Sequence, residues 1–199
     1  MKKVYILGSG RFAQNLKSSL KDYNSGSLEF LGYIKKNSKI KKKLNVNFIN
    51  GIGNFAYINY SKIINKYSNK KISFLTLVHN SAKIYPNSKI GKGSIVSENV
   101  LIKSDVKMGK HCIINSNVII SHNCILGEFV NISLGAIIAG NAVIGKNSFV
   151  GMGSLIINNI KIGKNVLIGA GSLVNKNLPD NVIAYGNPVK IIGQNNNEI

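Results

Sequence analysis

A six-residue repeat covers the second half of the chain and constrains its fold more than any other feature of the sequence. From Ile84 to Val174, every sixth residue is aliphatic or methionine, without a break in register. The residue four positions after each of these anchors is small or aliphatic, and glycine or asparagine recurs in between, where tight turns need left-handed backbone angles. The anchors are Ile84, Ile90, Val96, Ile102, Met108, Ile114, Ile120, Leu126, Ile132, Ile138, Ile144, Val150, Ile156, Ile162, Ile168 and Val174.

A period of six fits short strands joined by tight turns in a parallel β-helix, in which each repeat forms one side of a coil. With three sides to a coil, residues 84–179 predict about five and a third coils, with the anchors pointing inward. Cys112 and Cys124 fall in the second inward series, so we interpret both as small core residues rather than nucleophiles. The last coil would leave an open strand edge, which residues 180–199 are expected to cover as a C-terminal cap and tail.

Residues 1–83 read as a separate α/β domain. A predicted strand, Val4–Leu7, leads into the glycine turn Gly8-Ser9-Gly10 and then into a predicted helix from Arg11 to about Lys21. This is half of a Rossmann-type fingerprint, in which a helix N-terminus and nearby backbone amides bind phosphate. Further strands are predicted over 28–34, 46–49 and 72–78, with a helix over 55–67. These are too few strands for a full dinucleotide-binding fold, and no acidic residue ends the second strand as NAD binding would require.

Composition excludes several classes of protein. The formal net charge is +19, and residues 1–83 hold 16 basic against 2 acidic side chains, so this part of the chain is the one that attracts anions. We do not predict nucleic-acid binding, because all the basic residues but Arg11 are lysine and no aromatic-basic stacking surface is evident. No apolar run reaches the length of a membrane span and no signal peptide is evident, so a cytoplasmic location is expected.

The segment around His122 is similar to the active-site segment of a known enzyme family. Residues 121–133, the following Gly135-Ala136 and Ala139-Gly140-Asn141, and the ending Gly186-Asn187-Pro188-Val189-Lys190 resemble bacterial hexapeptide-repeat sugar acyltransferases. The enzymes of this family are related to UDP-N-acetylbacillosamine N-acetyltransferase and sialic acid O-acetyltransferase. The resemblance implies a left-handed β-helix behind a Rossmann-like half domain, acetyl-CoA as cosubstrate without a metal, and a homotrimer with CoA between neighbouring subunits.

The resemblance also implies where the nucleotide-linked sugar binds. In the family the α/β domain holds the nucleotide through the first glycine loop, here Gly8, Ser9 and Gly10. Further contacts come from the residues after the second strand, here Lys35 and Lys36, and from a later glycine, here Gly53. The family has an acidic pair where Lys35 and Lys36 stand. The two lysines would meet phosphate or carboxylate, or form a solvated lysine turn with the basic residues that follow.

Acyl transfer to an amine or hydroxyl needs a base with a near-neutral pKa, which directs attention to the three histidines. We expect His79 to be structural and His111 to be a solvated corner, whereas His122 is the candidate general base. Asn123 stands where the family commonly has a carboxylate, and is expected to orient the imidazole ring through its side-chain oxygen.

Two further residues are assigned to acetyl-CoA by the resemblance. Gly140 lies one coil after His122, where a missing side chain leaves room for the acyl-thioester arm and exposes a backbone amide. Asn131 replaces a second histidine that the family places near the acyl group.

The predicted activity is N-acetylation of a nucleotide-linked amino sugar in surface-glycan biosynthesis, and the alternative is O-acetylation of sialic acid. A non-catalytic trimer that binds sugar nucleotides is a further alternative. A metal-dependent γ-type carbonic anhydrase is disfavoured because the three histidines fall on different parts of the fold.

Overall fold

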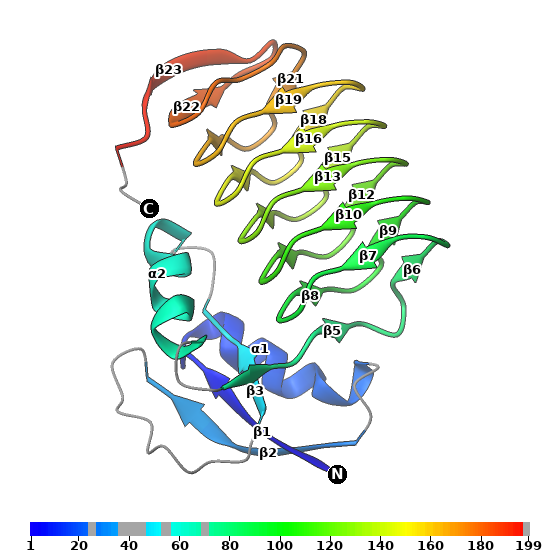
Figure 1. Ribbon diagram of the computed structural model, residues 1–199, viewed down its shortest axis with the longest axis vertical. Helices are drawn as coiled ribbons and strands as arrows, with labels where there is room; N and C mark the ends of the chain where they lie inside the picture. Colours follow the sequence, from blue (N-terminus) through cyan, green and yellow to red (C-terminus); the bar gives the residue numbers. More distant parts are fainter. Residues whose placement is uncertain (24–26, 36–46, 53–56, 69–71, 197–199) are drawn as a thin grey trace.

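The computed structural model describes residues 1–23, 27–35, 47–52, 57–68 and 72–196. A β-prism of short strands stands above a smaller α/β part (Figure 1). Lys36 and Gly53 lie outside the described residues. No helix in the described ranges is long and apolar enough to cross a membrane.

The prism has three faces, each formed by parallel strands, and we number the faces for reference. The first face is β7 (Lys89–Ile90), β10 (Lys107–Met108), β13 (Ile125–Leu126), β16 (Val143–Ile144) and β19 (Lys161–Ile162). The second face is β6 (Lys83–Ile84), β9 (Leu101–Ile102), β12 (Ile119–Ile120), β15 (Ile137–Ile138), β18 (Leu155–Ile156) and β21 (Leu173–Val174). The third face is β5 (Leu77–Val78), β8 (Ile95–Val96), β11 (Ile113–Ile114), β14 (Asn131–Ile132), β17 (Phe149–Val150), β20 (Leu167–Ile168), β22 (Val182–Tyr185) and, antiparallel to β22, β23 (Lys190–Gln194).

The predicted hexapeptide β-helix is confirmed, and its register is the predicted one. Ile120 pairs with Ile102 on the coil below and with Ile138 on the coil above, which is the 18-residue spacing of a three-sided coil. The anchors from Val96 onward are buried in one continuous core, while Ile84 and Ile90 pack against it at the open end. The ladder of the third face starts at β5, ahead of the predicted boundary at residue 84, and the β22–β23 hairpin covers its far end.

The core also contains both cysteines, as predicted. Cys112 and Cys124 are free thiols and fully buried. Burial raises the pKa of the Cys112 thiol to about 12, so this group stays protonated near neutral pH.

The N-terminal part is only partly Rossmann-like. Its parallel sheet has the order β2 (Leu28–Ile34), β1 (Lys2–Leu7), β3 (Asn47–Asn50) and β4 (Ser73–Phe74). The helices are α1 (Arg11–Ser19), the 3-10 turn η1 (Leu20–Asp22) and α2 (Tyr57–Ser68). The predicted strand over 72–78 is two strands, because β4 ends the α/β sheet and β5 starts the third face of the prism.

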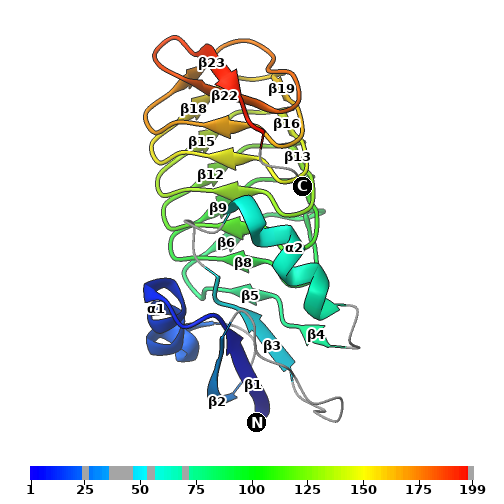
Figure 2. The same ribbon diagram turned by 90° about the vertical axis from the view of Figure 1, so that its left-hand side faces the viewer.

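Aromatic packing joins the α/β part to the prism. Ile64 and Tyr67 of α2 share one buried cluster with Phe74, Ile113 and Phe129, and α2 lies beside the prism (Figure 2). The two parts are therefore attached by a hydrophobic contact as well as by the chain.

His111 belongs to this junction, and its expected place on a solvated corner is wrong. Its ring is stacked on Phe129 at 5.2 Å between centroids and meets Phe74 edge-on at 5.1 Å. Gly93 lies against the ring from the coil below, where a Cβ atom would clash with the imidazole. Burial lowers the pKa of His111 to about 4, so the ring is neutral at physiological pH.

This burial predicts a pH-dependent stability. Because the folded pKa lies below the ordinary 6.5, the unfolded chain takes up the proton first as the pH falls. The free energy of unfolding is therefore highest above pH 6.5. It falls by up to roughly 3 kcal/mol between pH 6.5 and about pH 4. Urea unfolding of wild type and His111→Phe should show that the variant loses part of this pH dependence. Phenylalanine fits the turn, since Phe129 has φ 59° one coil on; parallel pH curves would contradict the prediction.

Candidate active site

His122 stands at an exposed corner of the prism, in the turn between β12 and β13. The turn forms because Asn123 adopts a left-handed backbone with φ 58°, a conformation that asparagine tolerates well. The Asn141 amide donates to the His122 carbonyl at 3.0 Å, which ties the corner to the coil above. The base candidate therefore has a rigid backbone and a ring that solvent and ligands reach.

Gly140 lies directly against the imidazole ring. A Cβ atom on Gly140 would come within 2.6 Å of Cε1 and 2.7 Å of Nε2 of His122. In this structure the missing side chain thus makes room for the histidine ring itself, rather than only for a thioester arm. The Gly140 amide makes no hydrogen bond with the described residues.

This close approach gives a direct prediction for Gly140→Ala. The new methyl group would displace the ring of His122, which is flexible and exposed, so the fold should be kept while the geometry of the base is lost. We expect kcat to fall by about 10²-fold with an unchanged melting temperature. Gly127→Ala is the matched control for a structural effect, because its Cβ would meet backbone atoms of Gly145 and Lys146. Full activity of Gly140→Ala would contradict the assigned ring position.

Asn123 contacts the base candidate, although not through the predicted atom. Its side-chain nitrogen Nδ2 lies 3.2 Å from Nδ1 of His122 and donates to Oδ1 of Asn141, also at 3.2 Å. Asn141 donates in turn to Oδ1 of Asn159 at 3.1 Å. The expected orienting contact exists, but the amide nitrogen faces the ring where the oxygen was expected.

Asn131 is not close to His122 within one chain. It begins β14 on the third face, is buried, and accepts a hydrogen bond from Nδ2 of Asn115 at 3.2 Å. The structure therefore groups His122, Asn123 and Gly140 and separates Asn131 from them.

A cavity of about 830 Å³ lies between the α/β part and the prism. Gly8, Ser9, Gly10 and Lys35 all line it, as expected from the sequence. Gly10 is the N-cap of α1, and Gly8 has φ +102° with its Cα packed so closely on Gly51 that a Cβ would lie 2.8 Å from the carbonyl oxygen. The loop thus holds the start of α1 at the cavity wall, where backbone amides and the helix dipole favour an anion.

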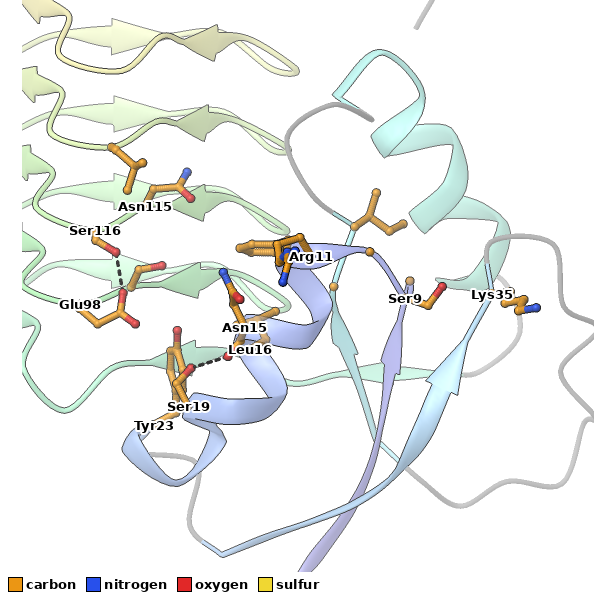
Figure 3. A pocket seen from close by; sticks show the side chains of 17 residues that line it. Ser9, Arg11, Asn15, Leu16, Ser19, Tyr23, Lys35, Glu98, Asn115 and Ser116 are labelled. Carbon is orange, nitrogen blue, oxygen red and sulfur yellow. Dashed lines mark hydrogen bonds between the residues drawn. The ribbon is translucent and has the colours of Figure 1, made fainter.

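Several lining residues were not found from the sequence. Arg11, Asn15 and Ser19 enter the cavity from α1, and Glu98 and Ser116 enter from turns of the prism (Figure 3). Glu98 and Ser116 are 18 residues apart, so the repeat places one above the other. The hexapeptide pattern does not indicate which corner of the prism faces the α/β part.

Glu98 gives the prism end of the cavity a negative charge. Its carboxylate accepts a hydrogen bond of 2.5 Å from the Ser116 hydroxyl. Partial burial alone would raise the pKa of Glu98, but hydrogen bonds from Ser116 and from the backbone and the charge of His79 outweigh it and lower this pKa. Burial, with the charge of Glu98, raises the pKa of the nearby Tyr23 to about 12.

The cavity and the base candidate lie on different corners of one prism. The cavity uses the turns after β8 and β11, which join the third face to the second. His122 is in a turn that joins the second face to the first. Among the described residues no group of His, Cys, Asp or Glu is arranged to hold a metal ion.

Comparison with known proteins agrees with this architecture. A family model described as "Bacterial transferase hexapeptide (six repeats)" matches residues 141–176, while no curated protein matches the sequence. PerB from Caulobacter crescentus, solved with CoA and GDP-perosamine, superposes with a TM-score of 0.85 at 25% identity over 97% of this chain and 98% of that chain.

Two further structures are similar along their whole length. The acetyltransferase domain of PglB from Neisseria gonorrhoeae, solved with acetyl coenzyme A, gives a TM-score of 0.82 at 25% identity over 96% of this chain and 99% of that chain. WeeI from Acinetobacter baumannii gives a TM-score of 0.82 at 20% identity over 96% of this chain and 100% of that chain. At this identity the similarity supports the fold alone. The chain thus carries the bacterial transferase hexapeptide repeat over residues 141–176 and is similar in structure to acetyltransferases, among them a GDP-perosamine N-acetyl transferase, in agreement with the predicted resemblance.

Proposed function

We propose that the protein transfers the acetyl group of acetyl-CoA to the amino group of a nucleotide-linked amino sugar in surface-glycan biosynthesis. The observation that carries this proposal is the exposed imidazole of His122, contacted by Asn123 and seated against Gly140. An acetyl-CoA-dependent enzyme working on sugar nucleotides is expected in the cytoplasm, where both are made.

The proposed reaction uses His122 as a general base. The sugar amine attacks the thioester carbonyl carbon while Nε2 of His122 takes the proton from the amine nitrogen. The carbon–sulfur bond then breaks, the amide product forms, and CoA leaves as a thiol after receiving a proton from the imidazolium. The Gly140 amide, which has no partner among the described residues, would donate a hydrogen bond to the carbonyl oxygen as negative charge develops there.

The cavity is charged in a way that suits a nucleotide-linked sugar. The glycine loop at the start of α1, Arg11 and Lys35 favour phosphate at the α/β end. Glu98 and Ser116 at the prism end offer hydrogen-bond acceptors to the hydroxyl and amino groups of a sugar.

Two subunits would complete the site. Since the cavity and His122 lie on different corners, a sugar held in one chain would meet His122 of a neighbouring prism across a trimer groove. A row of outward aliphatic side chains on the second face supports side-by-side packing of prisms, because Ile137 and Leu155 are 39% and 45% exposed. The other members of this row are Leu101, Ile119 and Leu173.

The trimer gives a prediction for Ile137→Asp. A charge in the centre of the aliphatic row would be buried against the neighbouring subunit, so the assembly should dissociate while each prism stays folded. Light scattering should show a trimer for wild type and a smaller species for the variant, with acetyl transfer lost in parallel. A wild-type monomer with full activity would contradict the two-subunit site.

The activity itself is tested by a binding screen followed by a reaction assay. Thermal shift with acetyl-CoA and with a panel of sugar nucleotides identifies ligands, and thiol release then measures transfer. Release only with nucleotide-linked amino sugars supports the proposal, and release with free sialic acid supports O-acetylation instead. Binding without release would identify a non-catalytic sugar-nucleotide-binding protein.

A further inference from the structure

A column of asparagine side chains runs along the corner that carries His122. Asn123, Asn141 and Asn159 occupy the same turn position on successive coils, each with φ close to +60°. Their amides form a chain of hydrogen bonds, in which Asn123 donates to Asn141 at 3.2 Å and Asn141 donates to Asn159 at 3.1 Å. The lower end of this chain is the 3.2 Å contact between Nδ2 of Asn123 and Nδ1 of His122.

The direction in which the column donates its hydrogen bonds, from Asn123 to Asn141 to Asn159, decides which ring nitrogen of a neutral His122 carries the proton. An amide nitrogen donates and cannot accept, so Nδ2 of Asn123 requires an unprotonated Nδ1 on the ring. The ring proton then sits on Nε2, the nitrogen next to Gly140. In this tautomer Nε2 is a donor and has no lone pair for the proton of an attacking amine.

Reversing the column produces the opposite tautomer. If all three amides are turned over, Oδ1 of Asn123 accepts from a protonated Nδ1, and Nε2 has a free lone pair. The three asparagines are exposed, so a single reversed amide, which places two oxygens or two NH₂ groups against each other, loses a hydrogen bond of the column to water. The three side chains are therefore coupled, and the histidine tautomer is coupled to all of them.

We propose that Asn141 and Asn159 are positioning residues that set the tautomer of His122 through Asn123, and that the base-competent form has the column reversed. This inference rests on the proposed role of His122 as general base. Neither Asn141 nor Asn159 needs to touch the substrate for this effect.

Aspartate substitutions at the two ends of the column separate this idea from a simple charge effect. Carboxylate oxygens only accept, so Asn159→Asp fixes the column in the direction of the structure and should lower kcat by about fivefold. Asn123→Asp fixes the opposite direction, with Nδ1 protonated, and should raise kcat by a similar factor. Both variants add one negative charge to the same corner, so an electrostatic effect alone would act in the same direction in both. Asp105 occupies this turn position one coil below with φ 62°, which indicates that aspartate is tolerated there.

Breaking the column in the middle provides the control. Asn141→Gly removes the connecting amide but keeps a residue that accepts the positive φ, so Asn159→Asp should have no further effect on kcat in that background.

Nitrogen-15 NMR of the labelled His122 ring reads the tautomer without any reaction, because protonated and unprotonated ring nitrogens resonate at well-separated frequencies. The expected spectra of the neutral ring show the Nε2 proton in Asn159→Asp and the Nδ1 proton in Asn123→Asp. Identical tautomers in the two variants would overturn the inference, even if the enzyme is active. A tautomer shift in a protein that acetylates no sugar would instead reject the proposed function and keep the coupling.

Discussion

His122→Ala is expected to lower kcat by roughly 10²- to 10⁴-fold, the usual contribution of a general base. The variant removes the imidazole assigned as the base, and the described neighbours Asn123 and Gly140 have no basic atom to replace it. Acetyl-CoA affinity should stay close to that of wild type, and the melting temperature should not change, because the side chain is exposed and outside the core.

The measurement is steady-state thiol release, with calorimetry for acetyl-CoA binding. The unchanged melting temperature and acetyl-CoA affinity serve as the controls for folding and binding. If His122→Ala keeps full activity, the deprotonated amine attacks unaided and the assignment of the base is wrong. A loss of acetyl-CoA binding equal to the loss of kcat would instead make His122 a binding residue.

Ile138→Asp is expected to unfold the prism. The side chain is fully buried in β15, between Ile120 and Ile156 on the neighbouring coils, and a carboxylate there would have no partner. The cost should be about 4 kcal/mol or more, which is a large part of the stability of an ordinary domain. Chemical unfolding followed by circular dichroism measures it.

The neighbouring Ile137 supplies the matched control for this experiment. It lies on the same strand with its side chain directed out of the prism, so Ile137→Asp should keep the secondary structure and the unfolding free energy of the isolated chain. If Ile138→Asp melts at the temperature of wild type, the inward assignment of the anchor series is wrong.

The prism could be predicted in detail because each coil repeats the same local rule. The anchors recur every six residues, the turns carry asparagine or glycine, and the register follows from both. Gly140 could be placed next to His122 because it follows His122 by the 18 residues of one coil. In the structure Gly140 does lie against the His122 ring.

Residues whose role depends on contacts between different parts of the fold could not be predicted in this way. His111 has the sequence context of a solvated turn, yet Phe74 from the α/β sheet covers it. Glu98 and Ser116 are ordinary turn residues until the α/β part closes a cavity over them. Asn123 is bonded to Asn141 and Asn141 to Asn159, and the hexapeptide pattern does not specify these side-chain contacts between coils.

The most direct test of the central claim is the product formed from acetyl-CoA and a nucleotide-linked amino sugar. Mass spectrometry and proton NMR of the reaction with wild type should show one acetyl group on the sugar nitrogen for each CoA released, and His122→Ala should form this product at least a hundredfold more slowly. An acetyl group on a sugar oxygen, or no product with any nucleotide-linked amino sugar while acetyl-CoA is bound, would contradict the account.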